Sequence, residues 1–164
     1  MKKNHLKTNK NLAQYFTPKI VVDFGWRLLR RFGVNDFTDL RIIDPAAGAG
    51  AWLSPVLRSR HGCADSVYGI EIDKSLKGVG EIRHFGDALC HNFPGVENST
   101  FDIVVGNPPF GRLSQFLSVS EIKKQNFKLA QFELLDECGK NMQSCPIEFL
   151  FLERALQLAR PGGW

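Results

Sequence analysis

The stretch that decides the fold is Leu40-Arg-Ile-Ile-Asp44, followed at once by Pro45-Ala46-Ala47-Gly48-Ala49-Gly50. The apolar run predicts a short buried strand, and the small residues after it predict a tight loop before a helix over about 51–60. Gly48 and Gly50 let a ligand approach the backbone closely, and we expect free N–H groups of this loop to point outward. A strand, a glycine loop and a helix start are typical of nucleotide-type sites in open α/β sheets.

Two apolar runs downstream end in acidic residues. Residues 66–73 (SVYGIEID) predict a second strand that reaches Glu71, and residues 80–85 predict a short third strand with Asp87 just beyond it. Glu71 lies about where an acid should accept hydrogen bonds from both hydroxyls of a ribose, since a carboxylate has two acceptor oxygens. Asp87 could accept from the amino group of an adenine ring. The alternative for either acid is a solvated position in a loop.

A fourth buried strand is predicted over Phe101–Gly106, followed by Asn107-Pro108-Pro109-Phe110. Each proline fixes its own φ and holds the residue before it extended, so the loop offers acceptors and few donors. The Asn107 side-chain oxygen and the Pro108 carbonyl could both accept from one NH₂ group, and the Phe110 ring offers a face for stacking. This pattern indicates a receptor for a planar amine. The alternative is an ordinary turn, because Asn and Pro are common there.

The glycine loop departs from the dinucleotide-binding fingerprint. A Gly-x-Gly-x-x-Gly reading needs glycine where Leu53 stands, and the Asp44 carboxylate would repel a pyrophosphate. It would suit a cation instead. An acid beside a positively charged amino acid moiety, with no phosphate in the ligand, points to S-adenosylmethionine and disfavours a nicotinamide oxidoreductase.

The N-terminal part predicts a basic tail and a first helix. Thr17 is the expected N-cap, with Pro18 at the first helical position, and the helix should run to about Phe32 and end at Gly33. The apolar residues that repeat at helical spacing are Ile20, Val21, Phe24, Leu28 and Leu29. Tyr15 and Phe16 precede this helix, and in the simplest interpretation they only fix it to the core.

The C-terminal part is less patterned. Between Gly111 and Pro146 the chain is polar and mixed, and part of it should be helical and cover the site, with one apolar face: Ile122, Phe127, Ala130, Leu134, Leu135 and Cys138. A last helix is predicted over 147–159, ending at Arg160-Pro-Gly-Gly163.

Length and charge are those of one globular α/β domain. The chain has 164 residues, 43% hydrophobic and 23% charged. Its excess of basic residues comes from Lys2, Lys3, Lys7 and Lys10, so the remaining body is balanced. We therefore expect a flexible basic tail over 1–10 and one catalytic domain over 11–164.

Metal and membrane signals are weak. Cys63, Cys90, Cys138 and Cys145 form no Cys-x-x-Cys pair and have no ligand spacing with the four histidines, so we expect reduced cysteines and no metal. The chain shows no long apolar run and no signal peptide. A cytoplasmic protein without membrane contact is expected.

Taken together, these motifs resemble the Rossmann-like, S-adenosylmethionine-dependent methyltransferases that modify adenine N-6 in DNA. The resemblance is to the type I modification subunits and the type II gamma-like enzymes, and it covers Asn11–Trp164. It implies a catalytic loop of Asn107, Pro108, Pro109 and Phe110. It also implies these cofactor-binding positions: Tyr15, Thr17 and Pro18 in the N-terminal motif; Asp44, Ala46, Gly48 and Gly50 in the glycine loop; Glu71 and Ile72 for the ribose; Asp87 and Ala88 for the adenine ring; and Asn107.

The chain departs from this family in two places. Ala49 stands where many members have Thr or Ser, which removes one hydroxyl contact. At Gly162-Gly163-Trp164 the chain stops where the family continues to a fifth strand, a hairpin and a target-recognition region. We therefore expect a truncated chain or one part of a split protein, with its fourth strand left as an exposed edge.

The resemblance implies methyl transfer to the 6-amino group of an adenine flipped out of double-stranded DNA, within a restriction-modification system. Target recognition would need a region outside this chain, and a specificity or complementing subunit is a candidate partner. Two alternatives stay open. One is an amine methyltransferase acting on RNA guanine or protein glutamine, and the other is a non-catalytic remnant that binds the cofactor or a partner.

Overall fold

The computed structural model describes residues 15–59, 64–76, 82–90, 92–116, 132–133 and 143–164. These residues form a parallel sheet with the strand order β3-β2-β1-β4. Its strands are β1 (Ile42–Asp44), β2 (Val67–Glu71), β3 (His84–Phe85) and β4 (Ile103–Val104). The predicted α/β class is confirmed. Because every pair is parallel, all the carboxyl ends of the strands lie at one edge of the sheet, the carboxyl edge.

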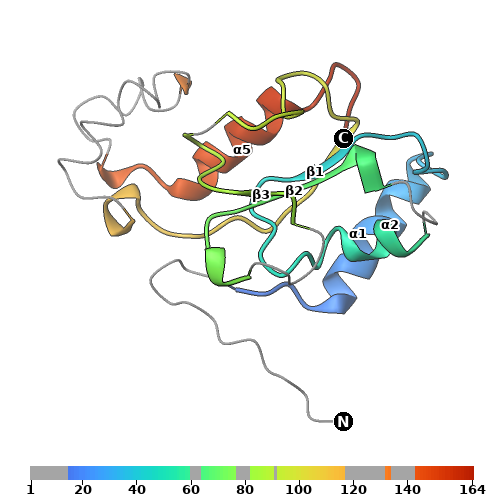
Figure 1. Cartoon of the computed structure of the whole chain (residues 1–164), viewed down its shortest axis with the longest axis horizontal. Coiled ribbons are helices and arrows are strands. Elements are labelled where there is room, and N and C mark those ends of the chain that lie inside the picture. Colours follow the sequence, from blue (N-terminus) through green and yellow to red (C-terminus); the bar gives the residue numbers. More distant parts are fainter. Residues whose placement is uncertain (1–14, 60–63, 77–81, 91, 117–131, 134–142) are drawn as a thin grey trace, which may run out of the picture.

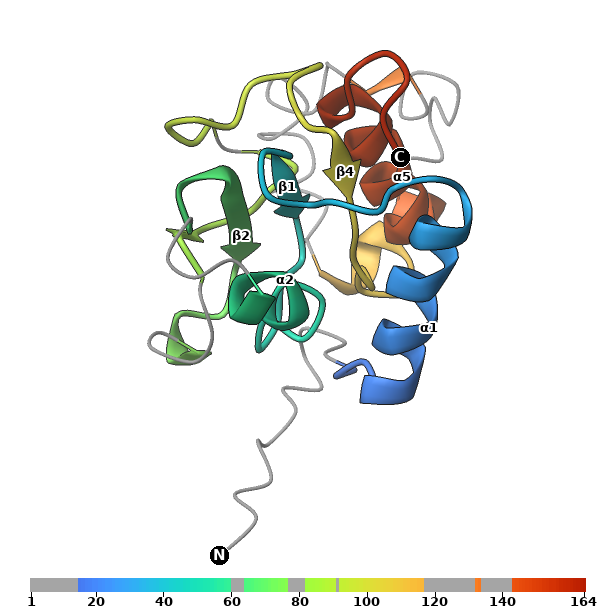
Figure 2. The same cartoon turned by 90° about the vertical axis from the view of Figure 1, so that its right-hand side faces the viewer.

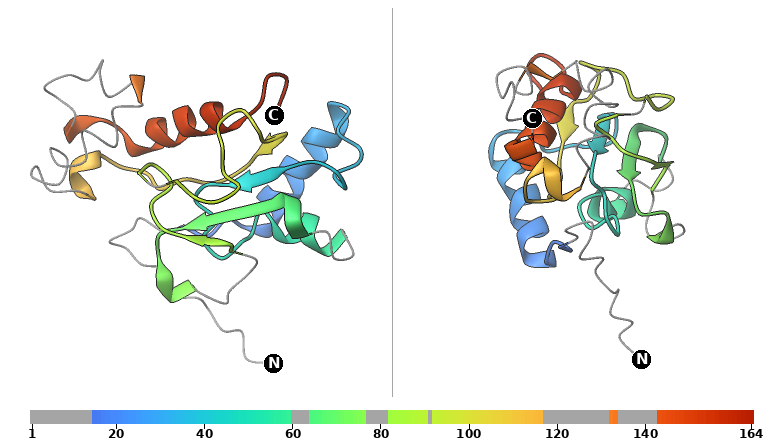
Figure 3. Two further views of the ribbon diagram at one scale, coloured as in Figure 1. Left: turned by 45° about the horizontal axis from the view of Figure 1, so that its top comes forward. Right: turned by 90° about the vertical axis from the view of Figure 1, so that its left-hand side faces the viewer.

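Helices cover both faces of this sheet (Figures 1 and 3). Helices α1 (Lys19–Arg31) and α2 (Ser54–Ser59) lie on one face, and α5 (Ile147–Leu158) lies on the other. Short 3₁₀ turns lie between the larger elements, among them η2 (Ala64–Ser66), η3 (Lys74–Leu76) and η4 (Leu113–Gln115).

Adjacent residues of β1 point to opposite faces of the sheet, as the two-residue period of a strand requires. Ile42 packs with α1 and α2, whereas Ile43 packs in the cluster that contains α5. Both side chains are fully buried. The sheet is therefore covered by apolar groups on both sides, which is the normal situation of a parallel sheet.

Helix α1 differs from its prediction at the start. It begins at Lys19, and Pro18 is the N-cap with an extended backbone and no side-chain cap. The assignment of Thr17 as N-cap is therefore wrong by one residue. The Pro18 carbonyl accepts from the backbone N–H groups of Val21 and Val22 and so starts the helix without a hydroxyl. The predicted end is confirmed, since Gly33 has a φ of 98°.

The buried face of α1 is not the one that its apolar repeat suggests. Val22 and Trp26 are buried, whereas Ile20 is 74% and Phe24 59% exposed. The Trp26 indole donates to the Trp52 carbonyl and meets the Phe37 ring edge-on. The contact with α2 and the β1 side of the core thus selects the face around Trp26.

The other elements are shorter than predicted. Helix α2 begins at Ser54 because residues 49–53 form turns. The last helix ends at Leu158, one residue early, and the turn after it closes with a hydrogen bond from Gly163 N–H to the Arg160 carbonyl. The predicted helix and cover between Gly111 and Pro146 fall largely on 117–131 and 134–142, outside the described residues, as do residues 1–14.

The outer edge of β4 is partly covered. Trp164 N–H donates to the Asp102 carbonyl, and Val104 N–H donates to the Trp164 carbonyl, both at 2.9 Å. The C-terminal residue therefore lies along β4, as Figure 2 shows. The expectation of an exposed edge is wrong at this point.

Within the described residues, no helix is both long and apolar enough to cross a membrane.

Candidate functional site

The acids and the amide singled out in the sequence follow the four strands at the carboxyl edge. Asp44 ends β1 and Glu71 ends β2, while Asp87 follows β3 and Asn107 follows β4. The register pairs Asp44 with Gly69, two residues before the end of β2, and pairs Glu71 with Phe85, the last residue of β3. The sheet thus brings these four side chains to one edge.

Asp44 is a buried acid with one unsatisfied oxygen. Its side chain is 0% exposed, Oδ1 accepts from Ala46 N–H at 2.9 Å, and Oδ2 has no hydrogen-bond partner among the described residues. Burial raises the pKa of Asp44 to about 7; the bond from Ala46 opposes that rise, and the charge of Glu71 adds to it. A buried carboxylate with a free oxygen is suited to a cation that brings its own donors.

Glu71 holds the glycine loop against β2. Its Oε2 accepts from Gly48 N–H at 2.7 Å and its Oε1 accepts from Asp73 N–H at 2.8 Å. The side chain is buried, and Ile72 next to it is half exposed. Each carboxylate oxygen keeps a second lone pair for a ligand hydroxyl.

The N–H groups of the loop are mostly satisfied internally. Ala46 N–H donates to Asp44, Ala47 N–H to the Ile70 carbonyl, Gly48 N–H to Glu71 and Gly50 N–H to the Ala47 carbonyl. The expectation of free, outward N–H groups is therefore wrong at these four positions. The neighbouring strand β2 supplies two of the four acceptors, the Ile70 carbonyl and the Glu71 carboxylate, which a local sequence pattern does not show.

Asp87 lies in a turn beside the end of β2. Its Oδ1 accepts from Leu89 N–H at 2.9 Å, and the preceding Gly86 N–H donates to the Glu71 carbonyl at 2.8 Å. Ala88 is buried in the core. The half-buried Asp87 is thus held near Glu71 by the backbone.

The N-terminal segment lies against both the glycine loop and the Asn107–Phe110 loop. The Tyr15 carbonyl accepts from the Asn107 side-chain Nδ2 at 3.2 Å, and the Phe16 ring lies 3.7 Å from where a Cβ of Gly48 would stand. Three segments far apart in the sequence therefore meet here. From the sequence, Phe16 is expected only to fix the helix to the core, and no local pattern indicates its contact with Gly48.

The Asn107–Phe110 loop is fixed at both ends. Asn107 is bonded to Tyr15, and beyond Phe110 the Gly111 carbonyl accepts from Ile147 N–H at 2.8 Å, at the start of α5. Residues 107–109 are half-buried, whereas the Phe110 side chain is 52% exposed. The loop therefore presents an accessible ring on a restrained backbone.

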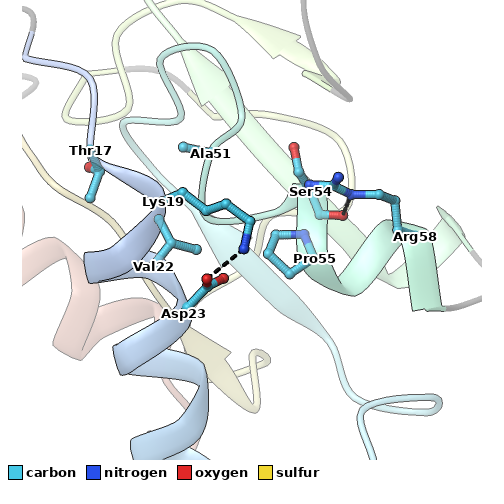
Figure 4. Close-up of a pocket in the computed structure, with 8 residues that line it drawn as sticks. All are labelled: Thr17, Lys19, Val22, Asp23, Ala51, Ser54, Pro55 and Arg58. Carbon is cyan, nitrogen blue, oxygen red and sulfur yellow. Dashed lines mark hydrogen bonds and ion pairs between the residues drawn. The ribbon is translucent and has the colours of Figure 1, made fainter.

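A cleft of about 360 Å³ lies beside this site (Figure 4), between the start of α1 and α2. Its lining residues are Thr17, Lys19, Val22, Asp23, Ala51, Ser54, Pro55 and Arg58. On one side of the cleft, Lys19 forms an ion pair with Asp23, which lies one turn further along α1. Of these lining residues, only Thr17 is an expected cofactor position, and Pro18 next to it is exposed. The cleft therefore adjoins the site but is not lined by Asp44, Glu71, Asp87 or Asn107.

No group of three or more His, Cys, Asp or Glu side chains that could hold a metal ion occurs in the described part of the chain. Within that part, Cys90 and Cys145 are not joined in a disulfide, and the other two cysteines lie outside it.

Comparison with known sequences identifies the family. The sequence model of the Eco57I restriction-modification methylase matches residues 65–164, more than half of the chain. The chain belongs to the Eco57I restriction-modification methylase family. The matched part holds β2 to α5, including Glu71, Asp87 and the Asn107–Phe110 loop.

Solved structures similar to this methylase-family chain support its fold. One, from Listeria monocytogenes and assigned to the class I S-adenosylmethionine-dependent methyltransferases, has a TM-score of 0.65 at 24% identity over 98% of this chain. A protein from Vibrio vulnificus YJ016, assigned as a type I restriction enzyme modification subunit, gives 0.56 at 17% identity over 92%. The type IIG restriction endonuclease BpuSI gives 0.53 at 19% identity over 96%. The predicted fold is confirmed.

The chain spans only 47%, 33% and 19% of the lengths of these three proteins. S-adenosylmethionine, the expected cofactor, is consistent with a methylase family and with this fold. The residues also fit it, because the buried free oxygen of Asp44 suits the ligand's ammonium group and Glu71 retains lone pairs for hydroxyls.

Proposed function

We propose that this chain carries the catalytic site of a DNA adenine N-6 methyltransferase of a restriction-modification system. Its substrate would be an adenine flipped out of double-stranded DNA, and its methyl donor S-adenosylmethionine. Family membership supports methyl transfer in such a system. The choice of an amine as acceptor rests on the catalytic loop.

The observation that carries the proposal is the orientation of the Asn107 amide. Its Nδ2 donates to the Tyr15 carbonyl, so Oδ1 is left as an acceptor beside the Pro108 backbone. An amino group has two N–H donors, and these two oxygens would accept one each. A loop that donated at this point would select a carbonyl or a ring nitrogen instead.

The remaining residues would hold the cofactor. Asp44 would accept from its ammonium group, Glu71 from its ribose hydroxyls and Asp87 from its adenine amino group. The methionine end of the cofactor would be covered by Tyr15, Thr17 and Pro18. When bound, S-adenosylmethionine supplies an electrophilic methyl group for direct transfer.

Asn107 and Pro108 would then raise the reactivity of the base. The 6-amino nitrogen of adenine is conjugated with its ring and is a poor nucleophile. Hydrogen bonds to the two oxygens would hold it pyramidal and localise its lone pair, and Phe110 would stack on the ring of the flipped base. The loop contains no cysteine, so no covalent intermediate on the protein is proposed.

Substitution of Asn107 tests this role. We expect Asn107→Ala to lower the rate of methyl transfer by about 100-fold or more, since one positioned polar group is commonly worth that much. Binding of S-adenosylmethionine should change by less than about threefold, because Asp44 and Glu71 remain. The control is Asn35→Ala, an exposed asparagine in the connection between α1 and β1.

The assay would measure transfer of a labelled methyl group to oligonucleotides rich in adenine, with RNA and protein acceptors in parallel. Calorimetry would measure cofactor affinity. Unchanged transfer by Asn107→Ala would refute its role. Label that appears on RNA or protein and never on adenine in DNA would refute the proposed substrate.

A further inference from the structure

Gly106, directly before Asn107, is not explained by its backbone conformation. Gly33, Gly48, Gly50, Gly95, Gly111 and Gly162 have positive φ angles, but Gly106 does not. Any L-residue could adopt its φ, so the absence of a side chain must have another reason.

The reason lies in the carboxylate of Asp44. A Cβ at position 106 would stand 2.8 Å from Asp44 Oδ1 and 3.5 Å from its Cγ, with Pro45 Cδ at an ordinary 3.9 Å. A Cβ is essentially never found within 3.0 Å of such a neighbouring atom, so an added methyl group would displace one of the two segments.

Neither segment can move freely. Asp44 is fully buried, and its Oδ1 accepts from Ala46 N–H at the entrance to the glycine loop. On the other side, Val105 N–H donates to the Ile43 carbonyl at 2.9 Å and holds the end of the β4 segment against β1. A side chain at 106 would therefore either break the bond to Ala46 or shift the backbone that leads into Asn107.

We propose that Gly106 is a positioning residue that lets the Asp44 carboxylate lie directly against the backbone entering the catalytic loop. This inference rests on the proposed function, in which Asp44 binds the cofactor cation and Asn107 binds the target amine. Gly106 then sets the spacing between the two. Gly106 itself would contact neither the cofactor nor the target amine. Its effect on the reaction would pass through Asp44 and Asn107.

The test is a set of variants that separates the shape of Asp44 from its charge. Gly106→Ala introduces the clash, Asp44→Ala removes the atoms that it meets, and Asp44→Asn keeps those atoms but removes the charge. Each Asp44 variant is made alone and combined with Gly106→Ala. The control is Gly25→Ala, whose Cβ would meet the Trp52 ring at 2.7 Å in the packing between α1 and the turn before α2.

Melting temperature and S-adenosylmethionine affinity are measured for each variant of the full chain. We expect Gly106→Ala to lower the melting temperature and to weaken cofactor binding about tenfold or more, since overpacking of this kind disturbs a buried group strongly. Gly25→Ala should lower the melting temperature and leave the affinity within about twofold. Added to Asp44→Ala, Gly106→Ala should cost little further stability, but added to Asp44→Asn it should still cost as much as in the wild type.

Two results would overturn the inference alone: a folded Gly106→Ala that binds the cofactor like the wild type, or a loss of melting temperature that is equal with and without the Asp44 side chain. A folded wild-type chain that ignores S-adenosylmethionine would overturn the proposed function and, with it, the positioning role. The two failures are therefore distinguishable.

Discussion

Asp44 and Glu71 are both buried acids, but they differ in the number of hydrogen bonds that they accept from the backbone. Both oxygens of Glu71 accept backbone N–H groups, whereas Asp44 has one such bond and one oxygen without a partner among the described residues. Charge-assisted hydrogen bonds to backbone donors offset the cost of burying a carboxylate. Glu71 therefore holds the loop without needing a ligand. Asp44, in contrast, would be stabilised by a ligand that donates a hydrogen bond to its second oxygen.

Glu71→Gln is expected to damage both the loop and the cofactor site. A glutamine side chain has one acceptor oxygen, so its NH₂ group would face the N–H of either Gly48 or Asp73. One backbone donor would lose its partner, at a cost of about 1–3 kcal/mol in the free energy of unfolding. Urea denaturation and calorimetry with S-adenosylmethionine would measure the two effects.

The control for that change is Glu97→Gln, an exposed acid at the opposite edge of the sheet that approaches Arg41. It should leave stability and affinity nearly unchanged. Equal behaviour of the two variants would show that Glu71 does not hold the loop.

Phe110→Ala is expected to act on turnover and not on folding. The ring is 52% exposed, so its removal leaves no cavity in the core. If a flipped base stacks on it, its loss should slow methyl transfer about 10- to 100-fold, the range that one base–aromatic contact supports. Single-turnover rates with saturating cofactor would measure this, and an unchanged rate would argue against stacking.

At the scale of elements, α1 shows how packing chooses between two apolar faces. The face around Phe24 has the more regular apolar repeat, but the buried face carries Trp26, whose indole N–H bonds to the Trp52 carbonyl. A large buried ring with a satisfied polar atom contributes more to stability than several exposed apolar side chains. Helix α1 is thereby fixed to the segment that follows the glycine loop.

This packing predicts unequal effects of two substitutions on one helix. Trp26→Ala should lower the free energy of unfolding by about 3–5 kcal/mol, because it removes a buried ring and leaves a cavity. Phe24→Ala should change it by less than about 1 kcal/mol in this chain, since Phe24 is 59% exposed. Urea denaturation of both would decide, and a larger loss for Phe24 would mean that the other face is buried.

At the scale of the molecule, opposite edges of the sheet carry acids whose pKa values are shifted in opposite directions. At the carboxyl edge, burial raises the pKa of Asp44 to about 7. At the amino edge, burial of Asp102 would also raise its pKa, but the hydrogen bonds from Arg160 and Arg41 outweigh that effect and lower it. The two acids should therefore act on stability in opposite pH ranges.

The signs follow from the direction of each shift. Asp44 binds its proton more tightly when folded, so its contribution is present below its ordinary pKa of 3.8 and is lost as the pH rises to about 7. The full change is about 4 kcal/mol. Asp102 binds its proton less tightly when folded, so its contribution is present above its ordinary pKa and is lost in acid.

Urea denaturation from pH 3 to pH 8 would check this. Relative to Asp44→Asn, the wild type should lose stability between about pH 4 and pH 7 and show a constant difference above that range. Relative to Arg160→Ala, it should lose its advantage only in acid. A difference from Asp44→Asn that does not vary with pH would contradict the burial of a titrating carboxyl group.

Much of this architecture could be predicted from local patterns. The β-branched runs before Asp44, Glu71 and Gly106 indicated parallel strands, and the glycine loop indicated a ligand edge. The segments 117–131 and 134–142, where a covering helix was predicted, lie outside the described residues, so that part stays a prediction. The assigned roles of the site residues likewise stay predictions until the variants are measured.

The local order of residues is enough to indicate which segments become strands and which residue types follow them, because both depend on near neighbours in the chain. Three contacts arise only from the folded arrangement: Glu71 bonds Gly48, Asn107 bonds Tyr15, and Gly106 leaves room for Asp44. The same holds for the choice of Trp26 over Phe24 as the buried side of α1. These contacts join residues that meet only after the parallel sheet has formed, so their energies depend on distances that no local pattern of residues records.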